Sequence, residues 1–462
     1  MIITARPDLG LDSLRSRFAG ELHAPGDAGY DDARQAWNLA VDQRPALVAL
    51  PRDADDVSAL MGFARANALR IAPQGTGHNA NARGSVADSI LVRTTLMRGV
   101  EIDPVARRAR VEAGALWMDV TAPASEHGLA ALAGSSPDVG VVGYTLGGGI
   151  GWLARALGLA CNSVTAIEVV TADGEQLRCD EDRHPELFWA LRGGTGSFGV
   201  ITALELELFP LPEVYQGVML WPWERSREIL RAWHEWTLDA PEAVTTSARI
   251  LQIPPMPDIP EAFRGRQFVA IDGAVMGTEA YAAEVLAPLR ALEPAMDLFA
   301  MAPPAGLVHV HMDPEHPVPG IGGHAMLDEL TPEAIDALVD VAGPGTDSPM
   351  LAVELRHLGG ALARVPARAG ATARLEAAYI LFAVGVPVTP ELAEAIPARL
   401  AALKAAVAPW AAERVYLNFA EEPTDTRSAY GEDAFAALQA VKAEYDPFDL
   451  IHANHPIAPA SR

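Results

Sequence analysis

The chain has 462 residues, half of them hydrophobic, and carries a formal net charge of −25 at pH 7. Because this is about three times the length of a common domain, we expect two or more hydrophobic cores. Its 60 acidic residues outnumber its 35 basic ones. This balance argues against nucleic acid and anionic membrane surfaces as partners, since both are bound through Lys and Arg.

The N-terminus and the cysteine count set the expected compartment. The opening MIITARPDLG lacks the basic and then apolar profile of a signal peptide. No apolar run approaches the roughly 18 residues that a membrane helix needs. Cys161 and Cys179 are too few for a disulfide framework or a cysteine-based zinc site. The sequence therefore predicts a cytoplasmic protein without a membrane partner.

The N-terminal half alternates helices with short strands. Apolar residues at helical spacing predict helices over 53–69 and 117–127. Asp173-Gly174 is typical of a hairpin turn between two strands. Strands are predicted over 89–92, 99–103, 107–112, 167–171, 175–179 and 204–208.

The segment Phe209-Pro210-Leu211-Pro212 marks a predicted domain boundary. Beyond it, helices and extended segments alternate, which predicts a sheet covered by helices. The predicted helices are 224–238, 279–292, 332–341 and 391–408, and the predicted strands are 268–275, 350–358 and 377–386. Near the end we predict a strand over 415–419 and a helix over 434–444.

Three glycine-rich loops stand out, at 73–78, 134–151 and 192–199. Glycine lets the backbone approach a ligand closely, and successive N–H groups can hold an anion. The segment Gly147-Gly148-Gly149-Ile150-Gly151 does not fit the G-x-G-x-x-G fingerprint, and no Walker lysine follows it. A short helix predicted over 152–157 would favour phosphate at its N-terminus. The loops favour a dinucleotide held in another kind of cradle, with simple tight turns as the alternative.

In their order and spacing, these loops resemble the flavin cradle of the FAD-linked oxidases of the vanillyl-alcohol oxidase superfamily, in the berberine-bridge-enzyme-like branch. The resemblance is strongest over 45–210 and returns at Tyr416-Leu417-Asn418-Phe419, Tyr445-Asp446-Pro447 and Asn454. It implies an α+β fold. A PCMH-type FAD-binding domain of two subdomains would span 1–210, an α/β substrate-binding domain 211–409, and a C-terminal segment returning to the FAD domain 410–462.

The resemblance also implies FAD bonded to His78, which ends the first glycine loop. Neutral imidazole is a competent nucleophile near pH 7, in agreement with that role. Many members carry a second tether, a cysteine, where this chain has Ser136, so we expect a single attachment. The residues expected to line the cofactor are Gln74, Gly75, Thr76, Gly77, His78, Asn79, Ser136, Asp138, Gly140, Gly143, Gly147, Gly148, Gly149, Gly151, Val200 and Asn454.

The activity implied by the resemblance is oxidation of a small organic molecule. Family members pass hydride from a C–H next to a hydroxyl or amine to flavin N5, and we expect O2 to reoxidise the flavin and give H2O2. A tyrosine after the asparagine of a Tyr-x-Asn-Tyr motif often serves as the base, but this chain has Phe419 there, which cannot take a proton. The catalytic candidates left open are Tyr144, Tyr379 and Tyr416, with Glu354 and His357 on another predicted pocket strand.

Phe419 also keeps an alternative open, a non-catalytic flavin-binding protein that interacts with a partner. The resemblance names neither the substrate nor the oligomeric state, and a homo-oligomer is compatible with it. It also leaves oxidase and dehydrogenase activity undistinguished, because specificity lies in the pocket walls rather than in the flavin motifs.

Three other patterns suggest chemistry that we discount. His309, His311, Asp313 and Glu315 are metal-ligand types, but two prolines interrupt the alternation that would gather them, so we expect a polar loop and no metal. The segment around Ser197 is only superficially similar to a hydrolase elbow, because Thr195 stands where that motif needs glycine. Trp233 and Trp236 stand at helical spacing and are predicted to be core residues.

Overall fold

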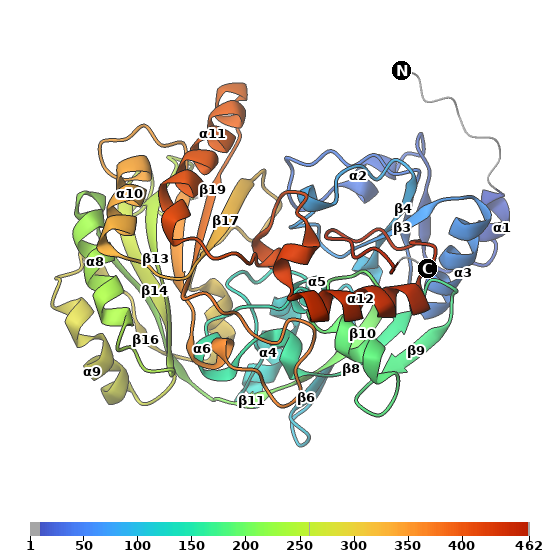
Figure 1. Cartoon of the computed structure of the whole chain (residues 1–462), viewed down its shortest axis with the longest axis horizontal. Helices are drawn as coiled ribbons and strands as arrows, with labels where there is room; N and C mark the ends of the chain where they lie inside the picture. The colour runs from blue at the N-terminus through green and yellow to red at the C-terminus, as the bar shows by residue number, and fades with distance from the viewer. Residues whose placement is uncertain (1–9, 258, 461–462) are drawn as a thin grey trace.

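The computed structural model describes residues 10–257 and 259–460 and has three main sheets with helices packed on them. The α+β class predicted from the sequence is confirmed. Within these ranges no helix is both long and apolar enough to cross a membrane. Figure 1 shows the N-terminal sheets on one side of the molecule and the large third sheet on the other.

The first sheet has the strand order β1-β2-β4-β3, in which β2, β4 and β3 run parallel. Its strands are β1 (Glu21–His23), β2 (Leu47–Leu50), β3 (Arg70–Gln74) and β4 (Ser89–Arg93). The helices beside it are α1 (Leu11–Arg15), α2 (Tyr30–Arg34) and α3 (Ala54–Ala66). Asp53 caps α3 by accepting a hydrogen bond from the backbone of Asp56, which satisfies a donor at the open end of the helix.

The second sheet is antiparallel and has the order β5-β6-β10-β8-β9. Its strands are β5 (Val100–Asp103), β6 (Arg108–Glu112), β8 (Val164–Val170), β9 (Gln176–Cys179) and β10 (Val200–Glu207). A small pair joins β7 (Leu129–Ala130) to β11 (Phe209–Pro210). The helices of this part are α4 (Trp117–Glu126), α5 (Val141–Leu146), α6 (Ala154–Leu157), α7 (Pro185–Leu191) and, from the end of the chain, α12 (Glu432–Tyr445).

The third sheet has the order β15-β12-β14-β13-β18-β19-β17, with β16 paired to β12. Its strands are β12 (Val214–Pro222), β13 (Val244–Gln252), β14 (Gln267–Val275), β15 (Met296–Asp297), β16 (Ala300–Ala302), β17 (Ile321–Leu327), β18 (Ala352–His357) and β19 (Tyr379–Gly385). Four helices cover one face: α8 (Ser226–Thr237), α9 (Glu279–Arg290), α10 (Pro332–Ala342) and α11 (Pro390–Val407).

The core beneath these four helices contains Trp233, which is fully buried, and Trp236 packs against it, as predicted for this pair. Alternate residues of the strands point to the other face, toward the N-terminal part of the chain. That face carries the buried charged residues Arg249, Asp272 and Glu354 beside an apolar cluster that includes Leu220 and Phe268.

Candidate flavin site

His78 follows β3 at the end of the first glycine loop, and neighbouring side chains hold its ring. The indole ring of Trp37 stacks on it with centroids 3.9 Å apart and planes 17° from parallel. Thr76 Oγ1 lies 2.8 Å from His78 Nδ1, within hydrogen-bond distance. Gly77 has φ 87, a left-handed conformation that favours glycine and turns the chain into this position.

The Asp138 carboxylate of the second glycine loop faces the same imidazole. Its Oδ1 lies 3.4 Å from His78 Nε2, and that nitrogen is buried without a hydrogen-bond partner among the described residues. Trp37 Nε1 donates to Asp138 Oδ2 at 2.5 Å, and Ser136 Oγ donates to Oδ1 at 3.0 Å. Burial raises the pKa of Asp138, but the contacts with His78, Trp37 and Ser136 outweigh it and hold that pKa below its usual range. Asp138 is therefore a carboxylate.

The backbone around His78 fits a bound dinucleotide. A Cβ built on Gly75 would lie 3.9 Å from its nearest neighbours, and one on Gly143 or Gly196 would have no heavy atom of the described chain within 4 Å. Nearby polar atoms are buried without partners in the same described ranges, namely Asn79 Oδ1 and His455 Nδ1. Open space beside glycines together with unsatisfied polar atoms suits a polar ligand such as FAD.

The other glycines of the second loop are enclosed by the chain itself. A Cβ on Gly147 would meet the Asn418 amide, and one on Gly151 would meet the carbonyl of Ala133. On Gly148 it would lie 2.9 Å from the Tyr416 hydroxyl, and on Gly149 it would clash with the Tyr144 ring. Packing alone thus requires glycine at these positions, while their contact with the cofactor stays a prediction.

The remaining expected cofactor residues lie around the same loops. Gln74 donates to Gln43 at 3.0 Å, and a Cβ on Gly140 would sit 3.7 Å from the Thr76 methyl group. Val200 begins β10 and is buried in the hydrophobic core between the first sheet and α3. Asn454 Nδ2 donates to the carbonyl of Asn79 at 2.6 Å.

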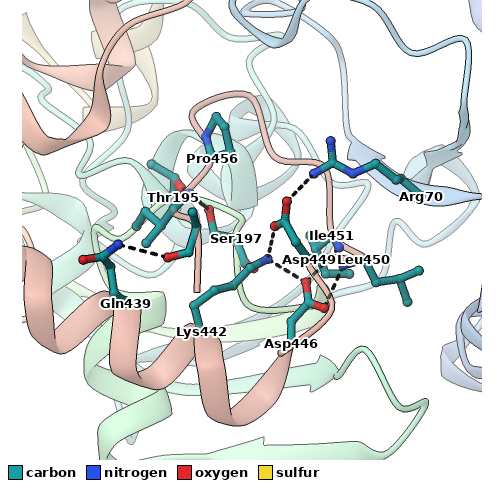
Figure 2. A network of polar contacts seen from close by, with 12 residues as sticks. Arg70, Thr195, Ser197, Gln439, Lys442, Asp446, Asp449, Leu450, Ile451 and Pro456 are labelled. Atoms are coloured by element: carbon teal, nitrogen blue, oxygen red, sulfur yellow. Dashed lines mark hydrogen bonds and ion pairs between the residues drawn. The ribbon is translucent and has the colours of Figure 1, made fainter. Parts of the chain in front are cut away.

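The end of the chain is anchored to the first sheet and the third glycine loop. The backbone N–H of Ile71 donates to Leu450 at 2.9 Å, which extends the first sheet beside β3. Figure 2 shows Lys442 of α12 pointing at Asp446, Asp449 and the carbonyl of Ser197. The Ser197 hydroxyl itself accepts from the backbone of Ile457 at 3.1 Å. Buried in this way, Ser197 holds the tail in place.

Tyr144 and Tyr416 come together at the second glycine loop. The Tyr416 hydroxyl accepts from the backbone of Gly149 at 2.7 Å and from Asn418 Nδ2 at 3.3 Å. Asn418 also donates to the carbonyl of Tyr144 at 2.9 Å. The Tyr144 hydroxyl is buried and lacks a partner in the described part of the chain. Burial raises the pKa of both phenols well above the ordinary value, so both are neutral.

Tyr379 is not part of this group. Its hydroxyl lies on the helix side of the third sheet, 2.6 Å from Thr237 Oγ1 and 3.3 Å from His234 Nδ1. His357 stacks on its ring there, with centroids 5.4 Å apart. Glu354 points to the opposite face, because neighbouring positions of a strand alternate. The structure thus separates the two predicted pocket residues of β18.

A buried network of charges occupies the inner face of the third sheet. The Asp272 carboxylate binds Arg249 and lies 3.0 Å from His311 Nδ1. His311 Nε2 lies 3.3 Å from Glu354, which accepts from Arg356 at 2.7 Å. The Arg356 guanidinium also stacks against two rings, those of Trp152 at 5.4 Å and Phe419 at 5.5 Å.

The pKa values in this network follow from its charges. Burial and Arg249 lower the pKa of His311, but Asp272, Asp313 and Glu354 raise it to about 9. Burial raises the pKa of Glu354, yet Arg356 and His311 bring it well below the ordinary range. Asp272 is held low by Arg249 and His311 against the same burial effect. Asp272 and Glu354 therefore stay ionised and His311 stays protonated at neutral pH, although all three are buried.

Sequence reasoning missed most of this network. It weighed His311 only as a metal ligand, and no group of three or more His, Cys, Asp or Glu in the described ranges is placed to hold a metal ion. Asp272 interrupts the largely apolar strand β14, and a charge in such a strand was the signal that could have pointed to it. Arg249 and Arg356 lie on β13 and β18, which carry other polar residues, so they gave no such signal.

One predicted strand is wrong, and one predicted helix is shorter than expected. Residues 415–419 form no strand, because Leu417–Phe419 is a 3₁₀ turn whose backbone bonds locally, as in the bond from Phe419 N to Tyr416 O at 3.0 Å. The helix predicted over 152–157 is only Ala154–Leu157, and Arg155 on it reaches into the third sheet, where Nε donates to Val244 at 2.8 Å. A helix this short contributes little dipole, so its predicted phosphate role has no support.

A cleft of about 820 Å³ opens beside Tyr416 and Gly147. Its walls come from residues 371–377, 412–417 and 429–434. His78 is not among its lining residues. The cleft therefore reaches Gly147 of the second glycine loop and Tyr416, but neither Tyr144 nor His78 lines it.

Comparison with known proteins finds relatives among FAD-linked oxidases. A FAD binding domain family matches residues 45–180. The chain is 37% identical over 203 residues to (R)-6-hydroxynicotine oxidase of Paenarthrobacter nicotinovorans, covering 44% of both chains. It is 31% identical over 222 residues to glucooligosaccharide oxidase of Sarocladium strictum, covering 47% of this chain and 44% of that one. The matched stretch thus spans less than half the length of these curated relatives.

The fold extends the likeness over nearly the whole chain. The crystal structure of 6-hydroxy-D-nicotine oxidase from Arthrobacter nicotinovorans superposes with a TM-score of 0.82 at 26% identity, covering 96% of this chain and 98% of that one. Physcomitrella patens BBE-like 1 shares the fold with a TM-score of 0.83 at 19% identity, over 98% of this chain and 100% of that one.

Together, the family match and the fold indicate a FAD-binding domain in the N-terminal part of the chain. The fold is that of the solved structures of 6-hydroxy-D-nicotine oxidase and BBE-like 1, to which the chain is similar.

Proposed function

We propose that this protein is an FAD-dependent oxidase that removes hydride from a C–H next to a hydroxyl or amine of a small organic molecule. In this proposal the FAD is bonded to His78 alone, and O2 takes the electrons to give H2O2. The observation that carries it is the enclosed imidazole of His78, stacked on Trp37 and facing the Asp138 carboxylate at the edge of an open glycine cradle. We also propose that it acts in the cytoplasm.

The chain's own residues would hold the cofactor and the substrate between them. Bound FAD would supply the hydride acceptor. Gly75, Gly143 and Gly196 leave room for its close approach, and Asn79 and His455 offer unsatisfied polar atoms to it. The inner face of the third sheet, with its buried charges, would form the wall opposite the cradle.

Tyr144 and Tyr416 are the best candidates for the residues that act on the substrate group that loses its proton. The Tyr416 hydroxyl accepts two hydrogen bonds from the chain, which leaves its own proton free to donate. The Tyr144 hydroxyl is buried without a partner in the described ranges. Tyr379 is less suited to this role, since its hydroxyl is bonded on the far side of the sheet. We propose that Tyr416, supported by Tyr144, orients the substrate group that loses its proton.

Acid precipitation followed by absorbance spectroscopy tests the attachment. Flavin should remain with the precipitated wild-type chain and be released from His78→Ala. Release from both proteins would contradict the tether. Because the relatives include an oxidase of hydroxynicotine and one of glucooligosaccharide, an anaerobic screen of cyclic amines and oligosaccharides tests the activity. Bleaching of the flavin by one class identifies the substrate.

Phe419 favours a second candidate, a flavin-binding protein without turnover. Its ring lies 5.6 Å from that of Tyr416 and under the Arg356 guanidinium, where many relatives carry the basic tyrosine. In that case the anaerobic screen would leave the flavin oxidised with every compound. Reduction by any of them excludes this candidate.

A further inference from the structure

Trp37, Ser136 and Thr76 fix the arrangement of His78 and Asp138. The Trp37 ring stacks on the imidazole, and its indole N–H donates to Asp138 Oδ2. Ser136 donates to the other carboxylate oxygen at 3.0 Å. One tryptophan thus orients both partners, and the remaining lone pairs of Asp138 Oδ1 face His78 Nε2 at 3.4 Å.

This arrangement selects one tautomer of the imidazole. A carboxylate beside Nε2 favours a proton on that nitrogen, as an aspartate does for a catalytic histidine. The other nitrogen, Nδ1, then carries the lone pair, and the Thr76 hydroxyl 2.8 Å away is placed to donate to it. His78 is held as a nucleophile at Nδ1 with its only proton aimed at Asp138.

Building on the proposed attachment of FAD, we propose that Asp138 is the positioning residue that prepares His78 for bonding to the flavin. As Nδ1 attacks, Asp138 takes the Nε2 proton, which solvent then carries to the peroxide. Asp138 is kept ionised for this task by Trp37 and Ser136.

The step balances with dioxygen as the oxidant. Nδ1 forms a bond to the 8α carbon while one C–H bond of that methyl group breaks. The electron pair of the C–H bond passes to the flavin ring, and O2 then takes both electrons. The two protons lost, one from the methyl group and one from Nε2, end on peroxide, so the methyl group, the imidazole and O2 give the linked flavin and H2O2.

The test is the rate of covalent attachment in Asp138→Asn, an uncharged residue of the same shape. Full-length protein produced under riboflavin limitation is mixed with FAD, and acid-stable flavin is followed with time. We expect attachment to slow on the order of 100-fold, in the range of general acid–base effects. Between about pH 7 and pH 9 the wild-type rate should change little, whereas the variant rate should rise about tenfold per pH unit as hydroxide replaces the carboxylate.

Two controls separate this role from a structural one. Asp138→Glu keeps the carboxylate and should recover part of the rate. Ser135→Ala alters the same loop at a hydroxyl that contacts Asp313 and not His78, and should attach FAD at the wild-type rate. FAD held without a bond should dissociate from Asp138→Asn as readily as from His78→Ala.

The outcomes are distinct. A wild-type chain that never retains flavin in acid contradicts the proposed tether itself. A wild-type chain that retains flavin, with Asp138→Asn attaching it equally fast and with the same pH profile, overturns the role of Asp138.

Discussion

Lys442 Nζ lies 2.6 Å from Asp446 Oδ2, and the two side chains are 0% and 1% exposed. The same ammonium donates to the carbonyl of Ser197 at 2.8 Å, while Asp446 accepts from the backbone of Leu450 and Ile451. One buried ion pair thus joins α12, the third glycine loop and the strand-like tail (Figure 2). It connects the end of the chain with the third glycine loop.

Replacing Lys442 by Met should destabilise the protein by about 3–5 kcal/mol, because Asp446 would be left buried without its counter-charge. Urea unfolding followed by circular dichroism measures the loss. Arg231→Met is the matched control, since Arg231 pairs with Asp336 at the surface with 46% of its side chain exposed. Equal stability of the two variants would show that the ion pair does not hold the tail.

The glycines of the second loop offer a contrast between packing and binding. Gly149→Ala should cost about 1–3 kcal/mol, because its Cβ would clash with the Tyr144 ring at a φ of 86. Gly143→Ala should leave stability nearly unchanged, as the described chain offers no atom within 4 Å of the new methyl group. If the space beside Gly143 holds FAD, this variant should bind it more weakly. Thermal unfolding and FAD titration measure the two effects, and unchanged FAD affinity in Gly143→Ala would remove Gly143 from the cradle.

The charge network on the third sheet predicts a loss of stability in alkali. The pKa of His311 in the folded protein is about 9, above its ordinary value of 6.5. Its contribution is therefore complete below about pH 6.5 and is lost as the pH rises through 9. We expect the free energy of unfolding, measured in urea, to fall over this window by on the order of 1–3 kcal/mol. His311→Gln should be less stable at neutral pH and should show a flatter alkaline limb, and an equally steep limb would assign the effect to another group.

The FAD-binding domain, the fold class and most elements could be predicted from the sequence, because they rest on local patterns. The helix at 53–69 is present as α3, since its spacing and the Asp53 cap act within a few residues. The glycine-loop motifs are also local, and the structure brings two of their residues, His78 and Asp138, together.

The features that the sequence did not predict depend on contacts between distant segments. The strand expected over 415–419 has no neighbouring strand to pair with in the described ranges, so its extended residues form a turn. Trp37 lies 41 positions before His78 in the chain and outside every recognised motif, so its stacking could not be read from spacing. The face of a strand on which a side chain lies also depends on tertiary packing. The Tyr379 hydroxyl lies on the helix side of the third sheet, whereas the Tyr416 hydroxyl contacts the second glycine loop.

Acid should destabilise the protein through histidines buried in the neutral form. Burial lowers the pKa of His357 to about 3 and that of His324 to about 4, both below the ordinary 6.5. His357 Nε2 accepts from Arg155 Nη1 at 2.8 Å, so its protonation would bring two positive groups together. The unfolded chain binds these protons first, and stability should fall as the pH drops from about 6.5 toward 4. Unfolding midpoints in urea across this range measure the decline. His357→Gln, whose amide oxygen can still accept from Arg155, should lose less stability than wild type over the same interval, and an identical decline would exclude His357 as a source.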